Sequence, residues 1–175
     1  MSLSHEGPIA EVERKWIMSN VPMKLKPSRI RGIQHFYTDE GRFTIDEFGD
    51  GSVRYVHCIK KSLDVPGGNS EEEKEIDERT FTDKTKGITP LRKTRFDFII
   101  GDRKWEIDSF HDINLIMGEV EWIFPLDKID MESVNSYEVP EEMEPYAISE
   151  VTGSKEFSNF SLFKKYVRTI TNGSL

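Results

Sequence analysis

Charged and apolar side chains alternate along several stretches of this chain, and this alternation constrains the fold more than any other feature of the sequence. Near the start, Glu11, Glu13 and Lys15 are each separated by a single residue. Because neighbouring side chains of a β-strand point to opposite faces, these three charges would share one face. Glu119 and Glu121 flank a valine in the same way. The pattern therefore predicts strands that each carry a row of charges.

Two further segments repeat the pattern, with Lys93 and Arg95 as a pair of cations and Glu73 and Glu75 as a pair of carboxylates. A single strand of this kind is ordinarily explained by an outer face that meets water. Several together favour a sheet that closes with its charged faces inward and its apolar faces outward. We therefore predict a barrel with a polar, charged lumen and with helices packed outside it.

The alternation and the turn residues between its runs divide most of the chain into strands. The predicted strands are 10–16, 32–37, 42–48, 53–60, 72–79, 91–100 and 117–124. The run 96–110 is predicted as a β-hairpin that turns at Gly101, and 63–70 is predicted as a loop, with the acidic run 71–73 as its solvated extension. Many strands and few helices indicate an antiparallel barrel, in an α+β fold that is mainly β.

Two helices are predicted late in the chain, over 126–134 and 158–171. The second helix has four apolar residues at helical spacing: Phe160, Phe163, Val167 and Ile170. Such a stripe normally faces a core, so we expect it to cover one side of the sheet.

Length and composition bound the class of protein. A chain of 175 residues suits one domain, taken here as 1–175. Its 24 lysines and arginines stand against 32 acidic residues, and this net charge of -8 disfavours general nucleic-acid binding. No apolar run is long enough to span a membrane, and no secretory signal is recognisable. The lone Cys58 is expected to be a packed strand residue in a reducing compartment, so we expect a cytoplasmic protein. The sequence does not indicate an oligomeric state.

A lumen that gathers carboxylates and cations has a specific chemistry. Clustered carboxylates raise one another's pKa values unless cations lie between them. Mg²⁺ or Mn²⁺ suits oxygen ligands from carboxylates and phosphates, while lysine and arginine side chains neutralise further phosphate oxygens. The pattern therefore predicts a site for a polyphosphate chain.

Five segments carry a family resemblance in the same order along the chain. They are 11–16 (EVERKW), 93–95 (KTR), 105–110 (WEIDSF), 118–121 (GEVE) and 151–162 (VTGSKEFSNFSL). Together they resemble the CYTH superfamily, the triphosphate tunnel metalloenzymes. The closing segment is most similar to the short, single-domain bacterial branch associated with inorganic triphosphatase activity.

The resemblance implies a tunnel of eight antiparallel strands with charged residues inside. It implies six metal ligands for Mg²⁺ or Mn²⁺: Glu11, Glu13, Glu119, Glu121, Glu73 and Glu75. It implies six phosphate-binding residues: Lys15, Arg42, Lys60, Lys93, Arg95 and Lys155. It also implies that Lys15 is catalytic, by orienting or activating the attacking water. The neighbouring Lys61 leaves the register of Lys60 open.

Two positions depart from the family pattern. Thr44 stands where the family has the second arginine of an Arg-x-Arg strand, so one phosphate contact is missing or comes from elsewhere. Phe36 stands where many short members have a tyrosine, and Tyr37 is expected on the opposite face of the strand. His35 could supply a polar group instead, although a structural role is the ordinary reading for a lone histidine.

The leading hypothesis is metal-dependent hydrolysis of a triphosphate inside the tunnel. One alternative is cyclic AMP formation from ATP, as in the class IV adenylyl cyclases of this superfamily. Another is a non-catalytic module that binds polyphosphate or a nucleotide. Inorganic tripolyphosphate, thiamine triphosphate, nucleoside triphosphates and RNA 5′-triphosphate ends all remain open as ligands.

Overall fold

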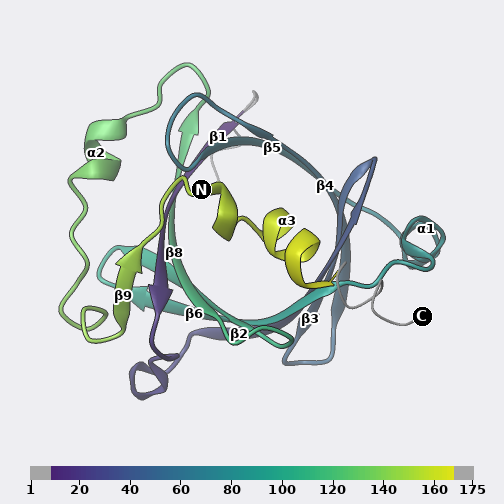
Figure 1. Cartoon of the computed structure of the whole chain (residues 1–175), viewed down its shortest axis with the longest axis horizontal. Helices are drawn as coiled ribbons and strands as arrows, with labels where there is room; N and C mark the ends of the chain where they lie inside the picture. The colour runs from purple at the N-terminus through teal and green to yellow at the C-terminus, as the bar shows by residue number, and fades with distance from the viewer. Residues whose placement is uncertain (1–8, 168–175) are drawn as a thin grey trace.

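A computed structural model describes residues 9–167, and its main feature is a closed barrel of eight antiparallel strands (Figure 1). The strands are β1 (Ile9–Met18), β2 (Arg29–Thr38), β3 (Gly41–Phe48), β4 (Val53–Ser62), β5 (Gly68–Glu75), β6 (Leu91–Ile100), β7 (Arg103–Phe110), β8 (Ile116–Pro125) and β9 (Ala147–Glu150). Around the ring they follow the order β5-β4-β3-β2-β6-β7-β8-β1, and β1 closes it by pairing with β5. The short β9 continues that edge of β1 outside the barrel. The predicted fold class is confirmed.

The largest apolar core lies on the outer face of the wall formed by β1, β6, β7 and β8. Trp16 and Trp105 stack there with ring centroids 4.9 Å apart, and both are buried. The segment that contains α2 (Met131–Asn135) covers them, because Val134 and Met143 pack into the same cluster. The apolar half of the alternation therefore faces outward, as predicted.

A second outer cluster lies under α1 (Glu78–Thr85). Phe81 of this helix packs against Phe36 and Phe43, which point outward from β2 and β3. The helix begins after Asp77, whose side chain accepts a hydrogen bond from the backbone N–H of Thr80.

The last described helix lies across one opening of the barrel rather than on its outside. It comprises α3 (Asn159–Leu162) and a π-helical turn, η3 (Phe163–Val167), and Figure 1 shows α3 within the ring of strands. Leu162 and Val167 pack against Leu91, Phe110 and Met117. These last three residues share the inward faces of their strands, and their apolar side chains need a cover at this end. The prediction that helices pack outside the barrel is therefore wrong for this helix, which covers inward-facing residues at one opening. Ile170 of the predicted stripe lies outside the described residues.

The predicted strands and the hairpin all overlap observed strands, although several boundaries differ. The loop after β4 is shorter than 63–70, since β5 already begins at Gly68. The strand predicted over 72–79 ends at Glu75, and residues from Glu78 onward are helical. Of the helix predicted over 126–134, only α2 forms, over Met131–Asn135. Two single 3₁₀ turns, η1 (Met23–Leu25) and η2 (Lys155–Phe157), complete the elements.

Gly67 explains why the loop is short. Its φ angle is +72°, and a Cβ atom there would lie 2.2 Å from the carbonyl oxygen of Glu13. The backbone N–H of Glu13 donates to the carbonyl of Gly67 at 3.0 Å. A residue without a side chain therefore lets the chain turn directly against β1, where the barrel closes.

The outer core makes a first prediction. Trp105 is 0% exposed and donates its indole N–H to the Tyr137 hydroxyl at 2.9 Å. We expect Trp105→Ala to lower the free energy of unfolding by roughly 3–5 kcal/mol, because it leaves a cavity and an unpaired hydroxyl. Ile148→Ala removes a side chain that is 65% exposed and should change it by less than about 0.5 kcal/mol. Chemical denaturation measures both, and equal losses would contradict an outer core centred on Trp105.

Candidate functional site

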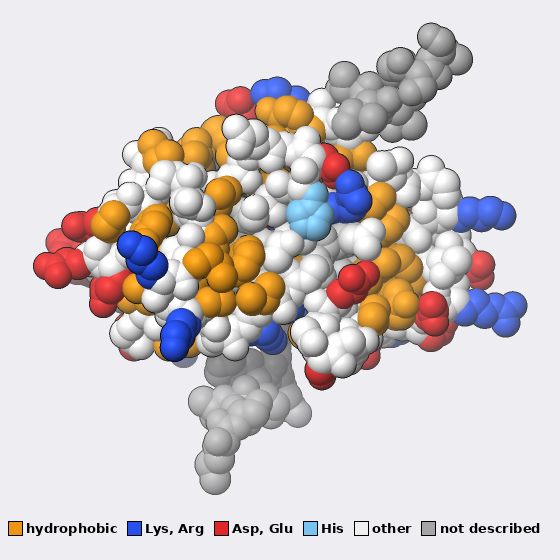
Figure 2. Space-filling model, turned by 90° about the horizontal axis from the view of Figure 1, so that it is seen from below, with side chains coloured by type: hydrophobic (Ala, Val, Ile, Leu, Met, Phe, Trp, Pro, Cys, Tyr) orange, Lys and Arg blue, Asp and Glu red, His pale blue; other side chains and the backbone are white. Residues whose placement is uncertain are grey.

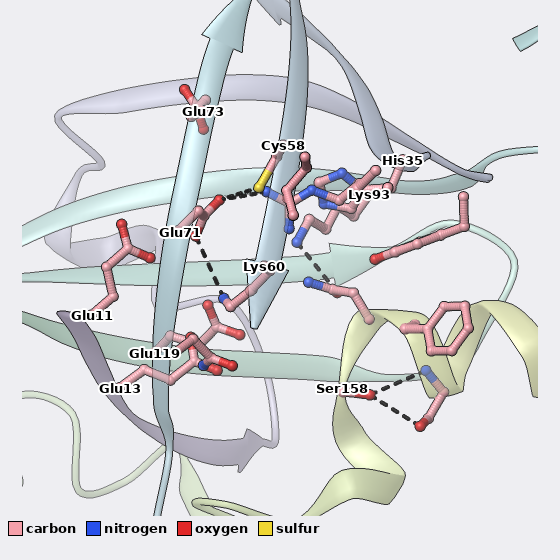
Figure 3. A pocket seen from close by; sticks show the side chains of 18 of the residues that line it. Glu11, Glu13, His35, Cys58, Lys60, Glu71, Glu73, Lys93, Glu119 and Ser158 are labelled. Atoms are coloured by element: carbon pink, nitrogen blue, oxygen red, sulfur yellow. Dashed lines mark hydrogen bonds and ion pairs between the residues drawn. The ribbon is translucent and has the colours of Figure 1, made fainter. Parts of the chain in front are cut away.

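A cavity of about 1100 Å³ lies inside the barrel. Its wall includes every residue predicted for the site except Glu75, which follows Glu73 on the same face of β5 but does not reach the cavity. In particular, one continuous cavity holds Glu11, Glu13, Lys15, Lys93, Arg95, Glu119 and Glu121. That part of the prediction is confirmed. Lys60, and not Lys61, faces this cavity (Figure 3).

Cations line the cavity together with nearly as many carboxylates. On the outer face seen in Figure 2, lysine and arginine side chains stand in small separate groups with acidic and apolar side chains between them. Ten lysines and arginines line the cavity, in a chain whose net charge is -8. Ten of the 24 basic residues are therefore placed around this one cavity.

The two signs of charge occupy opposite walls of the lumen. In the ring order, β1 and β2 are separated by three strands on either side, so they face each other across the barrel. β1 and the adjacent β8 carry four carboxylates into the cavity, on Glu11, Glu13, Glu119 and Glu121. The opposite strands β2, β3, β4 and β6 carry the arginines and two of the four strand lysines, Lys60 and Lys93. We call these the acidic wall and the basic wall.

The acidic wall holds more negative charge than its own cations neutralise. Glu13 and Glu121 are direct partners across β1 and β8, an arrangement that is unfavourable for like charges. Burial and repulsion from Glu106 and Glu13 raise the pKa of Glu121 to about 7. Burial, a hydrogen bond with Glu71 and repulsion from Glu121 raise the pKa of Glu11 to about 9. A bound cation would relieve this repulsion.

These carboxylates fit a divalent metal by their chemistry. Mg²⁺ and Mn²⁺ prefer oxygen ligands, and Glu11, Glu13 and Glu121 supply them without strong cation partners other than Lys15. Residues 9–167 contain no group of three or more acidic, histidine or cysteine side chains already spaced around one point as metal ligands. Binding would therefore draw the carboxylates together.

Lys15 lies in the acidic wall as a firmly held cation. Its Nζ atom is 3.0 Å from carboxylate oxygens of both Glu13 and Glu119. Although burial opposes it, the charges of these carboxylates raise the pKa of Lys15 above its ordinary value. Lys15 is thus protonated at neutral pH in this state and can donate hydrogen bonds, but cannot accept a proton from water.

Lys93 and Arg95 share one buried carboxylate, which sequence reasoning did not identify. Asp108 Oδ2 lies 2.6 Å from Lys93 Nζ, and Asp108 accepts from Arg95 Nε and Nη2 at 2.6 and 2.7 Å. Arg95 also contacts Glu106 and, at 3.5 Å, Glu119. The signal was present, because Glu106 and Asp108 alternate with apolar residues in 105–110.

Glu71 is the central carboxylate of β5, so its assignment to a solvated run was wrong. It accepts from Arg42 Nη2 at 2.9 Å and from the thiol of Cys58 at 2.7 Å, while Lys60 Nζ lies 3.7 Å away (Figure 3). Although burial opposes it, the hydrogen bond with Glu11 and the charges of Arg42 and Lys60 lower the pKa of Glu71 to about 2. Cys58 is buried in the strand, as expected.

Glu73 also lines the cavity, but its side chain is more exposed and more weakly paired than that of Glu71. Its side chain is 42% exposed, and Arg54 lies 3.5 Å from it. Lys155 lines the same cavity from η2, on the segment that leads into α3.

The tyrosine that faces the lumen is Tyr37, whereas we expected position 36 to face it. The predicted orientation of residues 34–37 was therefore shifted by one residue. Tyr37 lines the cavity and hydrogen-bonds with Arg42, whereas Phe36 packs outside on Phe81. His35 also points inward, with Nδ1 2.9 Å from the Thr44 hydroxyl. Burial and the nearby charge of Lys93 lower the pKa of His35 well below its ordinary value, so the ring is neutral.

Comparison with known proteins supports the fold and leaves the activity open. No protein-family model matches the chain, and no curated protein matches it. The structure is similar to that of the PH1819 protein from Pyrococcus horikoshii OT3, with a TM-score of 0.62 and 15% identity over 89% of this chain and 98% of that one. Weaker likenesses are to a conserved hypothetical protein of Pyrococcus furiosus (TM-score 0.47, 18% identity, 66% and 80% coverage) and to the PH1012 protein of P. horikoshii OT3 (0.43, 14%, 63% and 77%). Within the described residues, no helix is long and apolar enough to cross a bilayer.

The acidic wall makes a prediction about pH. The folded-state pKa of Glu121 is about 7 against an ordinary value of 4.5, so the folded protein binds the extra proton between these values. Stability that is present below pH 4.5 is therefore lost as the pH rises toward 7. Glu121→Gln carries no charge there, so its melting temperature should fall less than the wild type's between pH 5 and 8 in metal-free buffer.

The exposed Glu142→Gln is the matched control for this comparison. Its melting profile should follow the wild type across the same range. If Glu121→Gln also followed the wild type, repulsion in the acidic wall would be absent.

Proposed function

We propose that this protein hydrolyses a triphosphate, inorganic or organic, with the help of Mg²⁺ or Mn²⁺ bound inside the barrel. The observation that carries this proposal is the pair of facing walls within one enclosed cavity of about 1100 Å³. A metal ion suits the acidic wall, and a chain of phosphate groups suits the basic wall. The metal ion would supply the positive charge that the acidic wall lacks. The phosphate chain would supply the negative charge that the basic wall lacks.

The distribution of the cations favours a long anion over a single phosphate. Lys15, Arg42, Lys60 and Lys93 come from four different strands, β1, β3, β4 and β6. A chain of three phosphoryl groups can contact several of these strands at once, whereas orthophosphate reaches few of them. The cavity is also as large as typical small-molecule sites, which run to about 1,000 Å³.

Glu11, Glu13 and Glu121 are the residues we expect to hold the metal. A bound divalent ion would polarise phosphoryl oxygens and stabilise the charge that develops on the transferring group. Glu119 has a different part, because Lys15 and Arg95 already contact it. It positions these two cations beside the ligand.

In the reaction, a water oxygen forms a bond to the terminal phosphorus and the bridging P–O bond breaks. Orthophosphate and a diphosphate are released, and the proton that the water loses passes to the phosphate products or to solvent. Protonated Lys15 donates hydrogen bonds that orient the water or a terminal phosphate oxygen, and Arg95 and Lys93 hold charge on the oxygens of the phosphate chain. The free, buried thiol of Cys58 suits a reducing compartment such as the cytoplasm, where we expect the reaction to take place.

A substrate panel tests the function. Tripolyphosphate, ATP and thiamine triphosphate are each incubated with the full chain and with Mg²⁺, Mn²⁺ or EDTA. We expect orthophosphate release that depends on the metal and is abolished by EDTA. Pyrophosphate with cyclic AMP would instead indicate a cyclase, and tight binding without any product would indicate a non-catalytic module, so either result rejects hydrolysis.

Lys60 and Lys61 provide a matched pair for the basic wall. Lys60 faces the cavity, is only loosely paired with Glu71 and is 32% exposed along its side chain, whereas Lys61 is exposed outside the cavity. Lys60→Gln should weaken tripolyphosphate binding about tenfold, since one charge-assisted contact is lost, with little change in melting temperature. Lys61→Gln should leave the affinity unchanged. Calorimetry measures both, and equal affinities for the two variants would remove the lumen as the binding site.

The lysine pair is a cleaner test than the double change Lys93→Ala and Arg95→Ala. The alternation alone would suggest that this double change relieves repulsion between two cations on one face of β6 without unfolding the protein. The structure contradicts this reason, because both cations pair with the buried Asp108. Their removal would leave an unpaired buried carboxylate and destabilise the fold.

A further inference from the structure

Arg31 occupies an unusual position in the lumen. It lies on β2 directly across from Arg95 on β6, and both side chains point inward. Only 10% of the Arg31 side chain and 14% of the Arg95 side chain is exposed. Like charges that face each other across two strands destabilise a sheet unless opposite charges lie close by.

Arg95 has such partners at hydrogen-bonding distance, whereas the partners of Arg31 lie farther away. Arg95 binds Asp108 at 2.6 Å, whereas the carboxylate oxygens nearest Arg31 are all 3.8 Å away. They belong to Asp46, Asp97 and Glu106. Among the described residues, the buried Nε atom of Arg31 has no hydrogen-bond partner.

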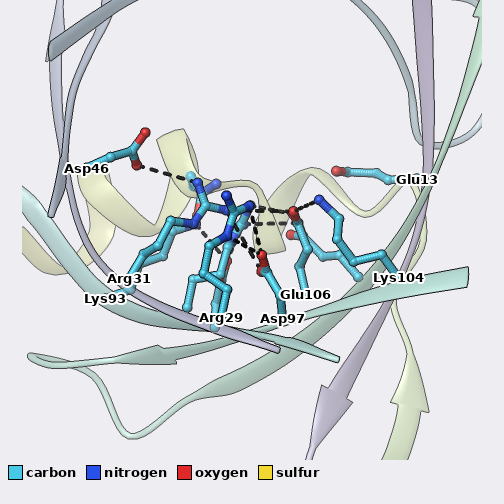
Figure 4. A network of polar contacts seen from close by, with 12 residues as sticks. Glu13, Arg29, Arg31, Asp46, Lys93, Asp97, Lys104 and Glu106 are labelled. Atoms are coloured by element: carbon cyan, nitrogen blue, oxygen red, sulfur yellow. Dashed lines mark hydrogen bonds and ion pairs between the residues drawn. The ribbon is translucent and has the colours of Figure 1, made fainter. Parts of the chain in front are cut away.

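Each of these three carboxylates has a closer cation of its own. Arg54 lies 2.9 Å from Asp46, Arg29 lies 2.9 Å from Asp97, and Lys104 lies 2.6 Å from Glu106. Figure 4 shows Arg31 within this network, between Asp46 and Asp97. Arg31 is therefore a cation that the network leaves incompletely paired, although the unpaired Asp97 Oδ1 atom lies 3.8 Å from its Nη2 atom. Burial and the charge of Arg95 lower its pKa, which is consistent with missing negative charge.

We propose that Arg31 is an anion-binding residue that, together with Arg95, holds a phosphoryl group of the ligand on β2 and β6. Its planar guanidinium presents Nε–H and an Nη–H in parallel, a fork that matches two oxygens of one phosphate. The choice of a phosphoryl ligand rests on the proposed function, whereas the need for an anion rests on the unpaired Nε atom.

The position of Arg31 gives it a defined part in selecting the ligand. β2 lies across the barrel from Lys15 and the acidic wall, and Figure 4 shows Glu13 on the far side of the lumen from Arg31. An anion held by both Arg31 and Lys15 must therefore extend across the lumen. We expect Arg31 to favour tripolyphosphate over pyrophosphate and orthophosphate. It also supplies a cation that the family pattern would place at Thr44.

The direct test follows the side-chain Nε–H signal of Arg31 by ¹⁵N NMR on the full chain without metal. The signal is assigned from its loss in Arg31→Lys. Titration with tripolyphosphate should shift it in a saturable way, with weaker responses to pyrophosphate and inorganic phosphate. If none of the three phosphates moves the Arg31 signal, the proposal is wrong.

A pair of variants tests the same residue by affinity. Arg31→Gln should weaken tripolyphosphate binding about tenfold in calorimetry, with no loss of melting temperature in the free protein. Arg54→Gln is the matched control, because Arg54 also pairs with Asp46 but does not line the cavity. It should keep the affinity of the wild type. Arg31→Lys keeps the charge without the fork and should bind with intermediate affinity.

These outcomes test the role of Arg31 separately from the proposed hydrolysis of triphosphates. Wild-type affinity in Arg31→Gln would overturn its role even if the protein hydrolyses triphosphates. A saturable shift of the Arg31 signal would support its role in binding. If, at the same time, no product formed with either Mg²⁺ or Mn²⁺, the hydrolase function would be rejected. If Arg31→Gln fails to fold, the wild-type titration and Arg31→Lys still decide the question.

Discussion

The structure depends on neutralising charges that it buries. Lys93 is only 1% exposed and Asp108 is equally buried, so each needs an opposite charge beside it. Arg95 joins them and links onward to Glu106 and Glu119. Because these side chains line the inner faces of neighbouring strands, one network both stabilises the barrel wall and forms the cavity surface. A ligand must therefore exchange contacts with a network that is already largely satisfied.

Imbalances in this network show where a ligand would be favourable. Glu11, Glu13 and Glu121 crowd carboxyl groups on one wall, which raises the pKa of two of them, and Arg31 is incompletely paired on the opposite wall. A cation at the first position and a polyanion across the lumen would correct both. The same reasoning separates cations that can be changed safely, such as Lys60, from those whose loss would leave a buried carboxylate unpaired.

The sequence predicted the barrel well because its signal is a period of two, and every predicted strand overlaps an observed one. That period shows which residues share a face, but not which face turns inward, so Phe36 and Tyr37 were exchanged. Glu71 was hidden in an acidic run whose register only pairing with Lys60 on β4 fixes. The apolar stripe of 158–171 was recognisable, but a helical period cannot say whether the helix packs outside a barrel or across its opening. Arg31 depends on distances among four strands, which no local pattern contains.

The seam between β1 and β5 has a consequence for motion. Only three residue pairs, Ala10 to Val12 with Gly68 to Ser70, join these strands, whereas nine pairs join β1 to β8 on its other edge. Local opening begins where few backbone hydrogen bonds must break together. We expect the wall to part first along this seam, with the fastest amide exchange of the ring. Since α3 lies across one opening of the barrel, brief parting at the seam would widen the lumen beside Glu11 without disturbing the buried pairs of Asp108 on the far strands.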